Sequence, residues 1–267
     1  MKLTVAFRQL IKIIRESHSE SLLAFQFVTL FVAVLAIGGL TDTALEVSSI
    51  YGNRELPIYS VGTQENKVAL SFDAAWGAED FDRIMEILDA HQVKTTFFMT
   101  GEWVEKYPEC VKKLVEKGHD LGNHSATHPD MTKLSKTQMK EEITKVHNAV
   151  FELTGYEMEL FRPPYGAYNN DVIRASYELG YFPIQWDVDS LDWKDYSAAQ
   201  IVKNVCSHKS LGPGSIILCH NGAKFTADAL DAMLTELKRQ GYQIVPISQL
   251  IMRENYHMDV TGMQVAD

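Results

Sequence analysis

Two histidines four residues apart are the first feature of this sequence that can carry chemistry. His124 and His128 stand in the segment Asn123-His-Ser-Ala-Thr-His128. On a helical turn, side chains four residues apart share one face, so the two imidazoles can bind one metal ion. Two unrelated surface histidines are the alternative, which the spacing alone leaves open. Other ionisable residues are expected close to these two histidines, and this favours metal binding over the alternative.

Three of these residues each follow an apolar run: Asp73, Arg162 and His220. A carboxylate at the end of a buried strand needs a partner, and a guanidinium holds it with charge-assisted hydrogen bonds. A histidine that titrates near neutral pH can donate a proton to a leaving group. A structural ion pair and a buried structural histidine are the simpler alternatives.

Acids and indoles gather in the same predicted loops. The segment Asp187–Trp193 holds three aspartates and a terminal indole, and Trp76 follows the first strand. Aromatic faces suit the apolar faces of sugar rings, although filling of the core explains them equally well. We take Trp76 and Trp193 as predicted substrate contacts.

The elements that must position these residues alternate from Lys67 onward. Apolar runs predict strands at 68–72, 95–98, 160–161, 182–186, 214–219 and 242–245. Amphipathic runs predict helices at 80–91, 108–117, 135–153, 170–179, 197–206 and 226–239. Repeated strand–helix units predict a mostly parallel sheet with helices outside. About 190 residues suit a compact or incomplete (β/α) barrel, whose loops after the strands meet at one rim.

Five motifs in this order resemble the polysaccharide deacetylase family, the NodB homology domain of carbohydrate esterase family 4. They read Ser71-Phe-Asp-Ala-Ala-Trp-Gly77, His124-Ser-Ala-Thr-His128, Arg162-Pro-Pro-Tyr-Gly166, Asp189-Ser-Leu-Asp-Trp193 and Leu218-Cys-His220. The resemblance covers residues 66–253. It implies an α/β fold, a distorted or incomplete (β/α) barrel of the NodB type. The first motif is most similar to the sporulation-associated PdaB-type branch of Gram-positive bacteria.

The resemblance also implies catalytic roles. Asp73 resembles the general base that activates water, and Arg162 resembles its partner. His220 resembles the general acid for the departing amine, tuned by Asp189. The backbone N–H of Tyr165 resembles the oxyanion donor.

The implied cofactor is zinc or another divalent metal. His124 and His128 resemble two of its ligands, and the metal would polarise the acetyl carbonyl and the water. The family's third ligand, a second aspartate, is replaced by Ala74. Catalytic zinc usually has three protein ligands, so two histidines should bind it more weakly.

Three functions remain open. The first is hydrolytic de-N-acetylation of N-acetyl sugars in cell-wall or spore-cortex polysaccharide, with a peptidoglycan-like glycan as partner. The second is a catalytically silent glycan-binding pseudoenzyme of the same fold, which the replacement at Ala74 favours. The third is hydrolysis of a small cyclic or linear amide. Intact Asp73, Arg162 and His220 favour the first.

The N-terminus predicts a membrane anchor. Leu22–Leu40 carries no charge and would span roughly 28 Å as a helix, close to the bilayer core. Basic residues before it and acidic ones after it put the N-terminus in the cytoplasm. The predicted parts are a cytoplasmic segment at 1–21, a transmembrane signal-anchor at 22–41, a linker at 42–65, an extracytoplasmic deacetylase domain at 66–253 and a tail at 254–267. A cleaved signal peptide is the main alternative.

The overall charge excludes one class of partner. The formal net charge is −10. Proteins that bind nucleic acids gain binding free energy when their basic residues displace counterions from the phosphates, and an acidic protein does not. We therefore expect no nucleic acid partner. Three widely spaced cysteines form no disulfide framework.

Overall fold

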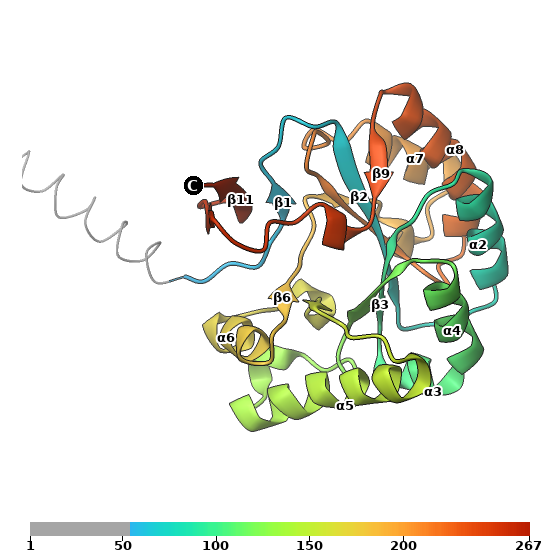
Figure 1. Ribbon diagram of the computed structural model, residues 1–267. Helices are drawn as coiled ribbons and strands as arrows, with labels where there is room; N and C mark the ends of the chain where they lie inside the picture. Colours follow the sequence, from blue (N-terminus) through green and yellow to red (C-terminus); the bar gives the residue numbers. More distant parts are fainter. Residues whose placement is uncertain (1–53) are drawn as a thin grey trace, which may run out of the picture. The chain divides into compact units, whose positions relative to one another are not determined.

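The computed structural model describes residues 54–267 (Figure 1). Glu55–Asp267 forms one compact unit. The predicted signal-anchor and the cytoplasmic segment before it lie outside the described residues. Within 54–267, no helix is both long enough and apolar enough to cross a membrane.

The central sheet has eight strands, and every pair in it is parallel. Their order is β6-β5-β4-β3-β2-β8-β7, and β9 pairs with β2. Their bounds are β2 Lys67–Ala74, β3 Thr96–Met99, β4 Asp120–Asn123, β5 Leu160–Phe161, β6 Phe182–Pro183, β7 Val188–Asp189, β8 Ile216–His220 and β9 Gln243–Val245. The end strands β6 and β7 do not pair with each other, so the barrel is incomplete, as predicted.

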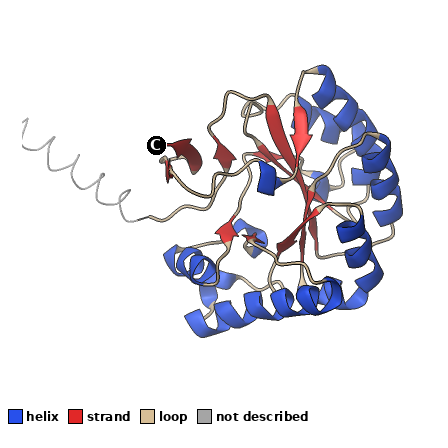
Figure 2. Ribbon diagram, in the orientation of Figure 1, coloured by secondary structure: helices blue, strands red, loops and turns tan. Residues whose placement is uncertain are grey.

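Helices surround this sheet on the outside (Figure 2). Their bounds are α2 Phe81–Ala90, α3 Gly101–Lys106, α4 Pro108–Glu116, α5 Lys136–Thr154, α6 Asn170–Glu178, α7 Ala198–Cys206 and α8 Thr226–Arg239, with 3-10 turns at Met131–Lys133, Pro164–Gly166, Asp192–Lys194 and Ile247–Gln249. The longest, α5, begins with a capping box at Ser135 and Gln138 and ends at Gly155, whose φ is 72°. Such caps satisfy the free backbone groups at both ends of a helix.

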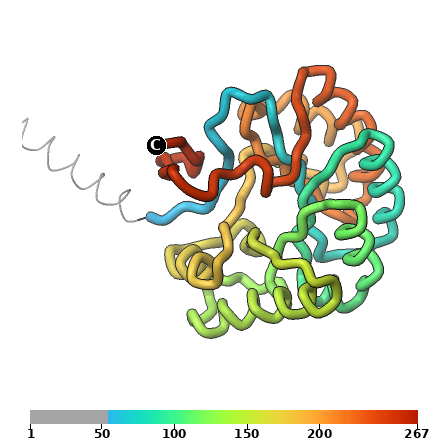
Figure 3. Tube along the Cα trace, in the orientation of Figure 1, coloured from blue at the N-terminus to red at the C-terminus, as the bar shows by residue number. Residues whose placement is uncertain are grey.

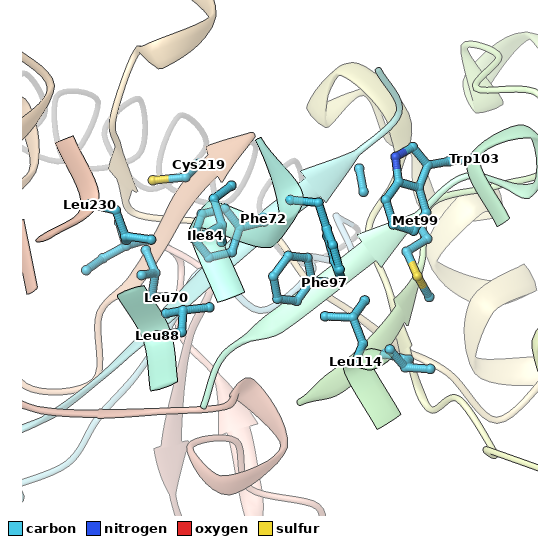
Figure 4. Packing of buried hydrophobic residues seen from close by; sticks show 14 of the residues in the cluster. Leu70, Phe72, Ile84, Leu88, Phe97, Met99, Trp103, Leu114, Cys219 and Leu230 are labelled. Carbon is cyan, nitrogen blue, oxygen red and sulfur yellow. The ribbon is translucent and has the colours of Figure 1, made fainter. Parts of the chain in front are cut away.

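Strand β2 separates the two layers of the core, because successive side chains on a strand point to opposite faces. Leu70 and Phe72 point outward into the larger apolar cluster, where they meet Leu88 and Phe97 (Figure 4). Ala69 points inward to the smaller cluster inside the barrel. Asp73 continues the inward series at the end of the strand.

A segment from the predicted linker lies in the gap of the barrel. Ile58 forms a bridge to Ile184, and Ser60 forms one to Ser215. Ile58 is fully buried, and its carbonyl accepts a hydrogen bond from the N–H of Gln185. Residues 55–61 are therefore part of the compact unit.

The predicted tail, 254–267, contains two strands. β10 (Tyr256–Met258) and β11 (Met263–Ala266) are antiparallel, and β11 pairs in parallel with β1 (Ser60–Val61). The trace in Figure 3 shows these last residues beside the first described ones. This three-stranded sheet is separate from the barrel sheet.

Four other elements differ from the sequence-based expectation, and two of them, β4 and β7, are strands outside the predicted set. The helix α3 was not predicted; it begins after Thr100, whose hydroxyl accepts a hydrogen bond from the N–H of Trp103. The strand predicted at 182–186 is only two residues long, because Ile184 already bridges to Ile58 outside it.

Candidate active site

A cavity of about 440 Å³ opens at the rim formed by the carboxyl ends of the strands. Its walls hold Ala75 and most of the predicted site residues, namely Asp73, Trp76, His124, His128, Tyr165, Trp193 and His220. They come from loops or strand ends after β2, β4, β5, β7 and β8. Asp73 and His220 are direct neighbours across the β2–β8 pair. The sequence-based expectation of one shared rim is thus seen in the structure.

Asp73 is held from beneath by Arg162. The Nη1 atom of Arg162 donates a hydrogen bond to Oδ1 of Asp73 at 2.7 Å. Its Nη2 atom donates to the hydroxyl of Ser71 and to the carbonyl of Gln185. Arg162 is fully buried and lies 4.1 Å over the ring of Phe98. Burial would raise the pKa of Asp73, but the charge and hydrogen bond of Arg162 hold that pKa below its usual range. Asp73 is therefore ionised and oriented.

The ring nitrogens of His124 and His128 face each other. Their Nε2 atoms lie 3.1 Å apart, and Oδ2 of Asp73 lies 3.5 Å from Nε2 of His124. His124 Nδ1 lies 2.6 Å from the carbonyl of Arg162. Donation to that carbonyl leaves Nε2 as the nitrogen that can accept a metal. Burial lowers the pKa of His124 to about 4 and also lowers the pKa of His128, so both imidazoles are neutral.

The loop that brings these histidines together is not the helical turn expected from their spacing. β4 ends at Asn123, and both Ser125 and His128 have positive φ, 67° and 56°. Tyr165, whose ring contacts that of His128, also has a positive φ of 61°. Non-glycine residues in this conformation store strain and are concentrated at functional sites.

His220 is held by Asp192, which takes the place that the sequence motif suggested for Asp189. Oδ1 of Asp192 lies 2.7 Å from Nδ1 of His220, and Oδ2 accepts from the backbone N–H of His220. The carboxylate of Asp189 instead accepts from the N–H of Leu191. Burial would lower the pKa of His220, but the hydrogen bond and charge of Asp192, with the charges of Asp73 and Asp189, raise it.

Aromatic side chains form the outer walls. The indole of Trp76 stacks on His220 with ring centroids 5.0 Å apart. Tyr165 meets the ring of His128 edge to face at 4.6 Å. Trp76, Trp193 and Tyr165 are all exposed, and Lys194 lies over Trp193. Exposed aromatic faces around a polar floor suit a ligand with both apolar faces and polar groups.

A metal ion fits these residues only in part. The two Nε2 atoms converge on one point and are imidazole donors of the kind that zinc prefers. Ala74 is fully buried in the outer apolar cluster with Phe72, on the other side of the strand from Asp73. Across residues 54–267, no group of three or more His, Cys, Asp or Glu side chains is spaced to hold a metal ion. His124 and His128 would hold the metal, and the third protein ligand is lacking.

A second cavity, of about 620 Å³, lies between α3 and α5. Ala126 and Thr127, from the loop between the two histidines, contribute to its wall, together with Glu102 and Glu105. It contains none of the predicted site residues, so its greater volume does not make it the chemical centre.

Sequence reasoning missed three supporting residues. Ser71 and Gln185 hold Arg162, and the hydroxyl of Thr226 donates to Asp192 at 2.6 Å. Only Ser71 gave a signal, since it lies two residues before Asp73 and so faces the same side of the strand.

The fold and the site together define a class of α/β domain: an incomplete (β/α) barrel with a carboxylate, two imidazoles and a third histidine at its rim. The polysaccharide deacetylase family model matches residues 60–184. The chain belongs to the polysaccharide deacetylase family.

Two curated relatives illustrate this membership. The chain is 38% identical over 213 residues to the peptidoglycan-N-acetylglucosamine deacetylase PgdA of Listeria monocytogenes, covering 79% of this chain and 45% of that protein. The chain thus spans less than half the length of that relative. It is 33% identical over 203 residues to the peptidoglycan-N-acetylmuramic acid deacetylase PdaA of Bacillus subtilis, covering 75% and 77%.

One similar solved structure is BA3943 of Bacillus anthracis, described as a CE4 family pseudoenzyme. It has a TM-score of 0.69 and 32% identity, and the match covers 78% of this chain and 70% of that one. A mutant of the same protein, with a TM-score of 0.69 and 33% identity over 78% and 72% of the two chains, is described as having restored enzymatic activity.

Proposed function

We propose that this chain removes acetyl groups from N-acetyl sugars of peptidoglycan or spore-cortex polysaccharide by hydrolysis. One observation carries the proposal: an ionised carboxylate, Asp73, and a histidine with a raised pKa, His220, are neighbours across one cavity. A base and an acid in opposite protonation states at the same pH are what amide hydrolysis requires. The peptidoglycan relatives support the substrate class.

The chain's own residues account for the proton transfers. Oδ2 of Asp73 takes a proton from water as the water oxygen attacks the acetyl carbon. His220, protonated and held by Asp192, donates a proton to the amine nitrogen as the carbon–nitrogen bond breaks. The products are acetate and the free amino sugar. The N–H of Tyr165, a residue that lines the cavity and has a positive φ, is the proposed donor to the developing oxyanion.

A zinc ion at His124 and His128 would supply Lewis-acid polarisation of the acetyl carbonyl and the water. Both histidines are neutral and face each other as the ion requires. Asp73 is the nearest further oxygen donor, but a carboxylate bound to metal is a weaker base. We therefore propose slow turnover that depends on added metal.

A catalytically silent glycan-binding protein is the second candidate. Ala74 favours this candidate, since its side chain is buried in the outer apolar cluster and offers no metal ligand. The similar protein BA3943 is described as a pseudoenzyme. Its rim would bind the same glycan through Trp76, Trp193 and Tyr165.

The deciding experiment incubates the protein with N-acetylglucosamine oligomers and with peptidoglycan, at several zinc concentrations, and measures acetate. The first candidate predicts acetate that is lost in Asp73→Asn and retained in Asp187→Asn, a half-buried acid outside the site. Glycan binding without acetate at every zinc concentration would select the silent protein.

The cellular setting is also part of the proposal. The uncharged run Leu22–Leu40 and its flanking charges support a single-pass anchor in the cytoplasmic membrane, with the barrel outside. The motif Ser71–Gly77 supports the sporulation-associated branch of the family. A C-terminal reporter that works only in the cytoplasm should be silent, and an active reporter would refute this orientation.

A further inference from the structure

Asp192, the partner of His220, has hydrogen bonds at both of its carboxylate oxygens. Oδ1 accepts from the ring of His220. Oδ2 accepts from the backbone N–H of His220 at 2.7 Å and from the hydroxyl of Thr226 at 2.6 Å. Asp192 and Thr226 are both fully buried. Loss of one of these donors would leave a buried carboxylate oxygen without a hydrogen bond, and such an unpaired buried group costs free energy.

Thr226 is also well fixed in the fold. It is the first residue of α8, and its backbone N–H donates to the carbonyl of Ala223. Thr226 therefore stands at the N-terminal, positive end of the helix, where a negative charge close by is favoured. The hydroxyl thus reaches Asp192 from an element other than those that carry Asp192 and His220.

We propose that Thr226 is a positioning residue for the general acid: it fixes the carboxylate of Asp192 so that Oδ1 stays bound to Nδ1 of His220. The inference rests on the proposed function for its catalytic consequence. Thr226 touches no reacting atom and acts through Asp192. When Nδ1 is bound in this way, Nε2 is the nitrogen directed to the substrate.

The test compares Thr226→Val, which removes the hydroxyl and nearly keeps the shape, with Thr226→Ser, which keeps the hydroxyl. We expect Thr226→Val to lower kcat about tenfold, as for the loss of one hydrogen bond to a charged group. KM should stay within about twofold, because the ground-state contacts to the glycan are unchanged. Thr226→Ser should recover most of kcat. Ser176→Ala, which removes a buried hydroxyl in α6, is the matched control and should change neither constant.

A second measurement does not need turnover. In the wild-type protein, the Nδ1 proton of His220 should give a low-field NMR resonance from its short bond to Asp192. Thr226→Val should shift or broaden it, and Thr226→Ser should restore it. If Thr226→Val does not fold, Thr226→Ala, which removes the same hydroxyl, replaces it in both measurements.

The outcomes separate the two proposals. No acetate from the wild type overturns the proposed function, and the resonance then decides the role of Thr226. An unchanged resonance in folded Thr226→Val overturns the positioning role, as does equal impairment in the valine and serine variants.

Discussion

The Nε2 atoms of His124 and His128 lie 3.1 Å apart, each in a buried or half-buried ring with a lowered pKa. Two neutral imidazoles at this separation either share one proton or share one metal ion. The neighbouring position 74 offers only a methyl group, so the strength of metal binding depends on these two rings.

We therefore expect the protein to bind zinc measurably but more weakly than a site with three protein ligands. Isothermal titration calorimetry on His124→Gln and His128→Gln should show loss of this binding, since each removes half of the donors. His257→Gln, an exposed histidine in β10, should leave it unchanged. Tight binding that survives both site substitutions would show that the metal lies elsewhere.

Substitution of Ala74 by aspartate should change zinc affinity and stability in opposite directions. The side chain at 74 is fully buried among apolar residues. Overpacking by the larger side chain costs about 1–3 kcal/mol, and an unpartnered carboxylate there adds to that cost. We expect a lower midpoint of urea unfolding without zinc, and tighter zinc binding as the strand end turns the new carboxylate to the ion. Ala74→Asn is the control for size. If zinc raises the unfolding midpoint of Ala74→Asp no more than that of Ala74→Asn, the new carboxylate does not reach the ion and the prediction is wrong.

Loss of Arg162 should be far more harmful than loss of a surface arginine. Arg162→Met leaves Asp73 buried with no cation bonded to it, and such broken pairs typically cost about 3–5 kcal/mol. Arg83→Met breaks the exposed pair with Asp228 and should cost less than about 1 kcal/mol. Chemical denaturation of both variants measures the difference. Equal effects would mean that Asp73 finds another partner or becomes protonated.

A buried histidine away from the site should make the protein sensitive to acid. Burial lowers the pKa of His119 to about 4, below its unfolded value of about 6.5. Between these values the unfolded state binds the extra proton, so stability falls as pH drops through this window. The shift corresponds to roughly 3 kcal/mol. Unfolding curves of zinc-free protein at pH 7 and pH 4 should show a smaller loss in His119→Gln than in the parent; His124 adds a further loss of the same sign in both proteins.

Periodicity predicted the elements that have strong patterns. α5 and α8 were placed within one residue of their observed bounds, because each has long amphipathic spacing and α5 has a clear start at Ser135 and end at Gly155. The helix α3 escaped notice because it has six residues and buries only Trp103 and Val104. Its stability comes from packing, which a short pattern does not reveal.

The partner of His220 could not be chosen from the sequence. Asp189 and Asp192 stand in one motif, and either could precede the histidine loop. Between the two lies Leu191, whose φ is 56°, and it is Asp192, after this turn, that bonds His220. A leucine in this conformation is unusual, and nothing in its residue type predicts it. In contrast, the place of Asp73 followed directly from strand alternation.

The insertion of Ile58 into the gap of the barrel has a consequence for how the barrel domain can be expressed without the residues that precede it. The carbonyl of Ile58 holds the N–H of Gln185, and the carbonyl of Gln185 in turn holds Arg162. A recombinant piece begun at residue 66, where the sequence motifs begin, would lack the first link of this series. If that piece were inactive, the cause would be the lost hydrogen bonds that position Arg162 and Asp73, and not the residues of the site themselves. A piece begun before Pro57 keeps the support intact.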